Sequence, residues 1–83
     1  MDRRYLVYGT RSCFFCLRAE KELTAREKDF IFIDLAKESD FLQEAKTFYN
    51  QETVPIILEN DLETGHTRLV GGCDDLLNLL GVD

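Results

Sequence analysis

Short apolar runs alternate with longer amphipathic stretches, and this alternation predicts both strands and helices. The apolar runs are rich in β-branched and aromatic residues, which favour strands. Strands are expected at 4–8, 30–34, 54–59 and 67–70. The run at 30–34 is nearly continuous, as in strands that are covered on both faces. The stretch at 60–66 is polar and contains Gly65, so it predicts a hairpin loop between the last two strands.

Three other segments have the residue spacing of amphipathic helices. Helices are expected at 14–27, 38–49 and 74–80. In the first of them, Cys16, Ala19 and Leu23 fall on one face. Ser39 or Asp40 is expected to cap the second helix, because short polar side chains accept from free N–H groups at a helix start.

The expected order of elements is β-α-β-α-β-β-α. The first two strands are joined through a helix, which predicts a parallel pair with a right-handed crossover. The last two strands should form an antiparallel hairpin. The sequence therefore predicts an α/β fold, in which a four-stranded mixed sheet is flanked by three helices. A chain of 83 residues predicts a single domain over 1–83.

The charge and the composition narrow the class of protein. The formal net charge is -6, which argues against a nucleic-acid partner. The charge is uneven, since residues 1–28 carry +3 and the remaining residues carry -9. Charged residues interrupt every apolar run, so we expect no membrane segment. We also expect a cytoplasmic protein that is a monomer. Three cysteines are too few for a disulfide framework, which favours a catalytic or metal-binding role for a close pair.

Cys13 and Cys16 are the clearest candidates for chemistry. Cys13 falls where a loop meets the first expected helix, and the free backbone N–H groups and the helix dipole favour a thiolate there. Cys16 lies one turn further on, on the same side of the helix and in a more enclosed place. We therefore expect Cys13 to attack a disulfide and Cys16 to resolve the mixed disulfide that forms.

Two other interpretations of this pair stay open from the cysteines alone. The first is that both are simply buried thiols on one helix face. The second is a zinc site, whose ligands would have to be Cys13, Cys16, Cys73 and His66. These residues contain no second close pair of ligands, so zinc is disfavoured. Two cysteines at this spacing after a first strand, at the start of a β-α-β unit, are typical of redox proteins.

Two further features lie far from the cysteines in the sequence. Pro55 is the only proline, follows Thr53 and Val54, and is expected at a strand start or in a cis turn. An ordinary proline at a strand entry is the alternative. Gly71 and Gly72 precede the last helix, whose free N–H groups can bind a carboxylate. A tight turn with an aspartate cap is an alternative that is compatible with this interpretation.

Together these motifs resemble the glutaredoxin family. The resemblance is carried by the pair Cys13 and Cys16, by Thr53-Val54-Pro55, and by the sequence GGCDDL at 71–76, and it extends over nearly the whole chain. It implies a thioredoxin-like fold in which Pro55 is cis and packs beside Cys13. It also implies thiol–disulfide exchange with glutathione as the co-substrate.

The resemblance further implies where glutathione binds. The peptide would pair with the Val54 backbone, its γ-glutamyl carboxylate would meet the backbone at Cys73 and Asp74, and the Asp74 side chain would accept from its ammonium group. The implied glutathione site comprises Arg11, Phe15, Gln51, Thr53, Val54, Pro55, Gly72, Cys73 and Asp74. The implied substrates are protein disulfides and protein–glutathione mixed disulfides, and ribonucleotide reductase is one implied partner.

Phe14 and Thr10 depart from the family pattern. Phe14 stands where proline is usual. Thr10 stands where a lysine usually holds the glycyl carboxylate of glutathione, and the adjacent Arg11 is the candidate replacement. The change at Phe14 keeps open a second function, a [2Fe–2S] cluster bridged between two chains by Cys13 and glutathione. The missing lysine keeps open a third, a redox protein that is reduced by thioredoxin reductase.

Overall fold

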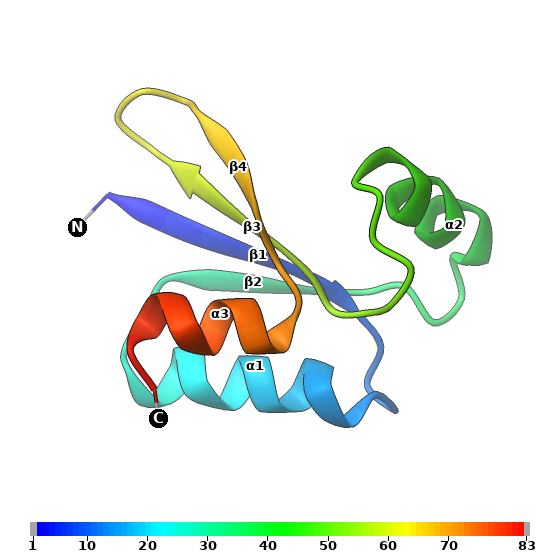
Figure 1. Ribbon diagram of the computed structural model, residues 1–83, viewed down its shortest axis with the longest axis horizontal. Helices are drawn as coiled ribbons and strands as arrows, with labels where there is room; N and C mark the ends of the chain where they lie inside the picture. The colour runs from blue at the N-terminus through cyan, green and yellow to red at the C-terminus, as the bar shows by residue number, and fades with distance from the viewer. Residues whose placement is uncertain (1, 83) are drawn as a thin grey trace.

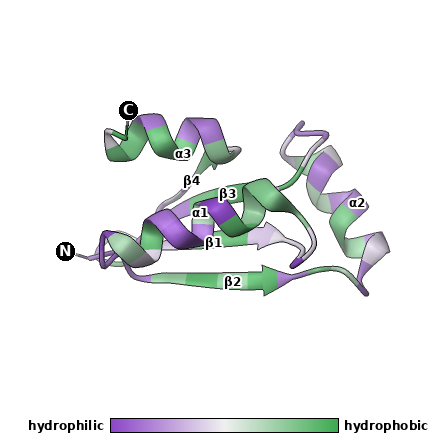
Figure 2. Cartoon of the chain, turned by 90° about the horizontal axis from the view of Figure 1, so that it is seen from below, coloured by the Kyte–Doolittle hydropathy of each residue, from purple (hydrophilic) through white to green (hydrophobic). Residues whose placement is uncertain are grey.

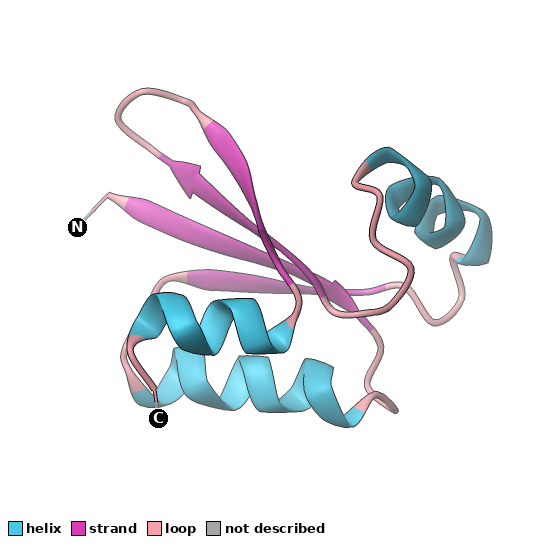
Figure 3. Ribbon diagram, viewed as in Figure 1, coloured by secondary structure: helices cyan, strands magenta, loops and turns pink. Residues whose placement is uncertain are grey.

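A computed structural model describes residues 2–82 and shows seven elements in the expected order (Figures 1 and 3). They are β1 (Arg3–Gly9), α1 (Phe14–Ala25), β2 (Phe30–Asp34), α2 (Ser39–Phe48), β3 (Ile56–Asp61), β4 (Thr67–Gly71) and α3 (Cys73–Leu80). Cys16, Ala19 and Leu23 are buried on α1, as their spacing predicts. The predicted α/β fold with four strands and three helices is therefore confirmed.

The four strands form one mixed sheet in the order β2-β1-β3-β4. β1 runs parallel to β2, with Val7 opposite Phe32, as expected for strands joined through a helix. β3 runs antiparallel to β1, with Val7 opposite Ile57, and antiparallel to β4. β1 and β3 are thus the central strands. Because they are antiparallel, the segment that follows β1 and the segment that precedes β3 leave the sheet at the same end.

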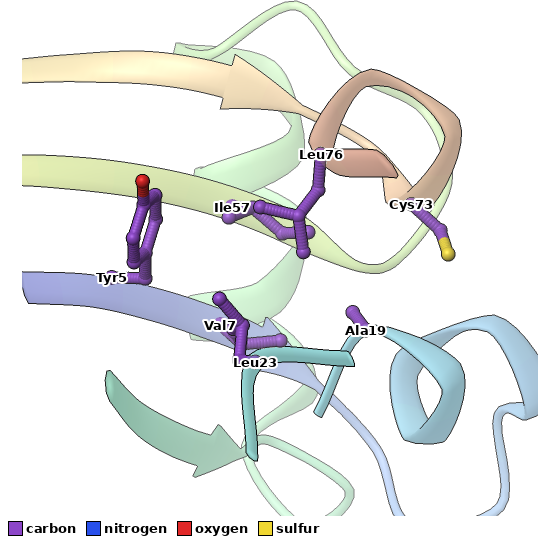
Figure 4. Close-up of a cluster of buried hydrophobic side chains, with 7 residues drawn as sticks. All are labelled: Tyr5, Val7, Ala19, Leu23, Ile57, Cys73 and Leu76. Carbon is purple, nitrogen blue, oxygen red and sulfur yellow. The ribbon is translucent and has the colours of Figure 1, made fainter. Parts of the chain in front are cut away.

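The main hydrophobic core lies between the central strands and two of the helices. α1 and α3 pack side by side on one face of the sheet, whereas α2 stands at its end (Figure 1). The buried side chains of this core are Tyr5, Val7, Ala19, Leu23, Ile57, Cys73 and Leu76 (Figure 4). Burying an apolar side chain contributes roughly 1.5–3 kcal/mol. Because Ala19 of α1 and Cys73 of α3 share this core, it holds the two helices against each other.

The position of β2 differs from the prediction. The expectation that 30–34 is covered on both faces is wrong, because β2 is an edge strand and Ile31 is 43% exposed. Figure 2 shows the apolar residues of β2 along the margin of the sheet. Successive side chains of a strand point to opposite faces. Phe30 and Phe32 therefore pack against the core while Ile31 faces outward.

The cap of α2 and the start of β3 also differ from the prediction. The N-cap residue of α2 is Glu38, and it forms no side-chain capping hydrogen bond. The prediction that Ser39 or Asp40 caps this helix is therefore wrong, since both residues lie inside its first turn. β3 begins at Ile56, two residues later than expected, because Pro55 has no N–H to donate to the ladder. Across residues 2–82, none of the helices has the length and apolar character needed to span a membrane.

Candidate active site

Cys13 lies between β1 and α1, and its sulfur is next to the segment that precedes β3. It is the N-cap residue of α1, with an extended backbone (φ -93°, ψ 117°). Its Sγ accepts a hydrogen bond from the Cys16 N–H at 3.2 Å. This bond satisfies one of the backbone N–H groups that are free at the start of a helix. Cys13 is partly exposed, so a substrate disulfide can reach it.

Cys16 has the opposite environment, although it is only one turn away. It is fully buried. Burial, followed by the neighbouring Cys13, raises the pKa of the Cys16 thiol to about 12. Gly9 makes room for this sulfur, since a Cβ at Gly9 would lie 2.5 Å from Cys16 Sγ. Cys16 therefore remains a protonated thiol at neutral pH, beneath the accessible Cys13.

The segment before β3 forms the wall beside the reactive sulfur. The Val54–Pro55 peptide bond is cis, as the family resemblance implies, and Pro55 is fully buried. The Val54 carbonyl oxygen lies 3.8 Å from Cys13 Sγ. The ladder between β1 and β3 ends at Ile56, so the Val54 backbone lies outside it. An extended peptide can pair with a backbone edge of this kind.

The start of α3 forms the opposite wall. Gly72 is the N-cap residue of α3, and its N–H donates to Asp75 Oδ2 at 2.9 Å. Gly71 has a φ of +124°, and a Cβ there would lie 2.2 Å from Asp75 Oδ2, so this turn requires glycine. Cys73 follows with its side chain in the core, and burial raises the pKa of its thiol. The turn thus presents backbone rather than a reactive sulfur.

A groove runs between these two walls. Its lining residues are Phe15, Gln51, Thr53, Val54, Pro55, Gly72, Cys73, Asp74 and Asp75. Eight of the residues predicted for glutathione are therefore brought together in one place. Asp75 was not predicted. An acidic residue three positions after a helix N-cap is the spacing of a capping box, and that spacing was the available signal.

Arg11 is the predicted residue that the structure places elsewhere. Its guanidinium group pairs with the Glu20 carboxylate and lies 4.0 Å from the centre of the Phe32 ring. It is therefore held on the side of α1 and β2, away from the groove. The expectation that Arg11 replaces the usual lysine is not supported by this arrangement. Among residues 2–82, the side chains lining the groove include two carboxylates and neither lysine nor arginine.

The two phenylalanines between the cysteines are both exposed. Phe14 is 69% exposed and Phe15 is 54% exposed, and their rings meet edge to face with centroids 5.4 Å apart. Phe15 lines the groove, whereas Phe14 does not. An exposed aromatic pair of this kind offers an apolar contact surface next to Cys13.

The described residues hold no ready-made metal centre. In the part of the chain from 2 to 82, no three side chains of His, Cys, Asp or Glu are grouped to bind a metal ion. His66 is exposed in the loop between β3 and β4. A cluster bridged between two chains would use Cys13 alone from each chain, and this function stays a prediction.

The fold and the paired cysteines define a class of protein. The protein has a thiol–disulfide exchange centre on a thioredoxin-like fold. This centre is built on a β-α-β unit and comprises Cys13 at the start of α1, the buried Cys16 and the cis Pro55. The chain matches the Glutaredoxin family over residues 6–61. It belongs to the glutaredoxin family.

Individual relatives agree with this assignment. Glutaredoxin 1 of Rickettsia typhi is 32% identical in an alignment 79 residues long, which covers 89% of this chain and 67% of that protein. The crystal structure of a wheat glutaredoxin superposes with a TM-score of 0.77 at 29% identity, over 93% of this chain and 70% of the wheat chain. The solution structure of a dithiolic glutaredoxin of Trypanosoma brucei brucei gives a TM-score of 0.69 at 35% identity, over 93% and 78% of the two chains.

Proposed function

We propose that this protein reduces protein disulfides and protein–glutathione mixed disulfides, with glutathione as the electron donor. One observation carries the proposal: Val54, which lines the groove together with the start of α3, has its carbonyl oxygen 3.8 Å from the partly exposed sulfur of Cys13. The Val54 backbone suits pairing with the glutathione peptide. The first N–H groups of α3 suit its γ-glutamyl carboxylate, and the Asp74 carboxylate suits its ammonium group.

In the first step, the Cys13 thiolate attacks one sulfur of the substrate disulfide. A bond forms between Cys13 Sγ and that sulfur, the original S–S bond breaks, and the other sulfur leaves with the electron pair and takes a proton from solvent. Cys16 does not compete for the substrate, because it is buried and protonated.

In the second step, the mixed disulfide on Cys13 is resolved. Cys16 loses its proton and attacks Cys13 Sγ, which releases the bound thiol and leaves a Cys13–Cys16 disulfide. Two glutathione molecules then supply two electrons and two protons, which restores both thiols and forms one glutathione disulfide. When the thiol bound to Cys13 is glutathione, a second glutathione thiolate can attack its sulfur directly, which frees the Cys13 thiolate and forms one glutathione disulfide without Cys16.

We further propose that the reaction takes place in the cytoplasm and that a disulfide of ribonucleotide reductase is among the substrates. The reducing cytoplasm supplies glutathione and favours free thiols, which suits a protein with three unpaired cysteines.

The direct test is a glutathione-coupled assay of mixed-disulfide reduction. Cys13→Ser is expected to abolish activity, because Cys13 is the one cysteine among residues 2–82 that is not buried. Cys16→Ser is expected to keep activity on glutathione mixed disulfides and to lose it on protein disulfides that need both thiols. Full activity of Cys13→Ser would overturn the assignment of the nucleophile.

A second candidate is a redox protein reduced by thioredoxin reductase. The observation that favours it is the absence of lysine and arginine from the groove lining among residues 2–82, because glutathione is an anion. Supplying the oxidised protein with NADPH, glutathione and glutathione reductase, or with NADPH and thioredoxin reductase, separates the two. Turnover with the second system alone would replace glutathione as the donor.

A further inference from the structure

Gln51 makes contacts that differ from those of a ligand-binding side chain. It follows the end of α2, and its backbone N–H donates to the Lys46 carbonyl at 2.9 Å. Its side-chain Nε2 donates to the Pro55 carbonyl at 2.7 Å and to the Thr53 carbonyl at 3.4 Å. The side chain therefore spans Val54 and ties the residues on either side of it to the end of α2.

The side-chain nitrogen of Gln51 is engaged by the chain itself. A glutamine amide carries two N–H groups and one acceptor oxygen. The nitrogen donates to the Pro55 carbonyl and, over a longer distance, to the Thr53 carbonyl. Its contacts are therefore with the wall of the groove, whereas the family resemblance implies a contact with glutathione.

The same amide group also lies against the opposite wall of the groove. A Cβ built on Gly72 would lie 3.9 Å from Gln51 Nε2 and 3.9 Å from the Pro55 carbonyl oxygen. The Gly72 N–H in turn donates a hydrogen bond to the Asp75 carboxylate at 2.9 Å. The Gln51 amide thus sits where the segment before β3 approaches the start of α3.

The reactive sulfur lies against the residue that Gln51 spans. The Val54 carbonyl oxygen is 3.8 Å from Cys13 Sγ, and the two carbonyls held by Gln51 belong to the neighbours of Val54. Fixing both neighbours fixes the direction of the Val54 carbonyl and N–H. A shift of about 1 Å in groups that orient a reaction can lower a rate by up to about a hundredfold.

We propose that Gln51 is a positioning residue for thiol–disulfide exchange: it holds the Val54 backbone at a fixed place relative to Cys13 and to Gly72. The proposal rests on disulfide exchange at Cys13 and is independent of the choice of glutathione as the donor. The Gln51 side chain then acts as part of the wall of the groove, which every disulfide substrate would contact.

The test compares two substrates in single-turnover reactions with the reduced protein. One is a cysteine peptide joined to glutathione, and the other is the same peptide joined to 2-mercaptoethanol. Gln51→Met keeps the length of the side chain and removes both donors, so we expect it to slow both reactions alike, by about fivefold. Gln43→Met is the matched control, because Gln43 is exposed on α2 and should leave both rates unchanged.

A pH profile of Gln51→Glu supplies a readout that a purely structural role would not move. The introduced carboxylate cannot donate to the Pro55 carbonyl, whereas the protonated carboxyl group can. The rate of this variant relative to the parent protein should therefore rise as the pH falls. This ratio decides the question even if Gln51→Met fails to fold.

Three results would overturn the proposal. They are unchanged rates in Gln51→Met, a loss confined to the glutathione disulfide, and a ratio for Gln51→Glu that does not change with pH. The second result would return Gln51 to a direct contact with glutathione. A parent protein that reacts only with the 2-mercaptoethanol disulfide would instead overturn glutathione dependence and leave the role of Gln51 to be judged on that substrate.

Discussion

The two cysteines of one helical turn differ because their surroundings differ. Cys13 caps α1 at the surface, and Cys16 is fully buried against Gly9. Burial favours the neutral form of an ionisable group, and the neutral form of Cys16 is the thiol. Folding therefore raises the pKa of Cys16 from 9.0 to about 12. A group with a raised pKa in the folded state stabilises the fold below the pKa of the unfolded chain.

This shift predicts a pH dependence of stability. The contribution of Cys16 should be complete below pH 9 and should be lost as the pH rises towards about 12. Tyr5 and Tyr8 act in the same direction, since burial raises the pKa of each phenol above 10.0. Urea unfolding at pH 8 and pH 10.5 should therefore show a smaller loss of stability in Cys16→Ala than in the parent chain. Equal losses in the two proteins would show that the Cys16 thiol does not titrate with folding.

Among the strands, one buried carboxylate joins three of them. Glu59 of β3 is 6% exposed, accepts from Tyr5 of β1 at 2.9 Å and accepts from Arg68 of β4 at 2.7 Å. Burial alone would raise the pKa of this carboxyl group, but the hydrogen bonds from Tyr5 and Arg68 outweigh burial and lower it. The Glu59 carboxylate therefore stabilises the pairing of β3 with β1 and with β4, near the hairpin between β3 and β4.

Replacing this carboxylate should weaken the sheet without touching the groove. Glu59→Gln is expected to lower the free energy of unfolding by roughly 1–3 kcal/mol, because it weakens charge-assisted hydrogen bonds to a buried group. Since the pKa is lowered by folding, the stability from Glu59 is present above the pKa of the unfolded chain and is lost in acid. Denaturation at pH 7 and pH 3 measures this difference. The expectation fails if Glu59→Gln loses as much stability in acid as the parent protein.

The order of elements could be predicted from the sequence because it depends on local periodicity. The neighbours of each element could not be predicted in the same way. The apolar run of β2 is equally compatible with a central strand and with an edge, so the exposure of Ile31 was missed. The direction of Arg11 depends on Glu20 and Phe32, which lie on two other elements. Long side chains at a site are thus the least predictable part of it.

In the molecule as a whole, the core and the active site are built on the same elements. Ala19 of α1, Ile57 of β3 and Cys73 of α3 pack in one core and belong to the three elements that border the groove. The groove is therefore a consequence of how the fold closes at one end of the sheet. Its chemistry depends on Cys13, the one sulfur among residues 2–82 that is not buried there.

The role of Cys13 can be measured by trapping the mixed disulfide. Cys16→Ser removes the thiol that resolves the intermediate, so treatment with glutathione disulfide should leave one glutathione on the protein. Mass spectrometry of proteolytic fragments should locate that glutathione on Cys13 and leave Cys73 unmodified, since the thiol of Cys73 is buried. Adding Cys13→Ser should abolish the adduct. Glutathione found on Cys73, or no adduct on Cys13, would contradict thiol–disulfide exchange at the start of α1.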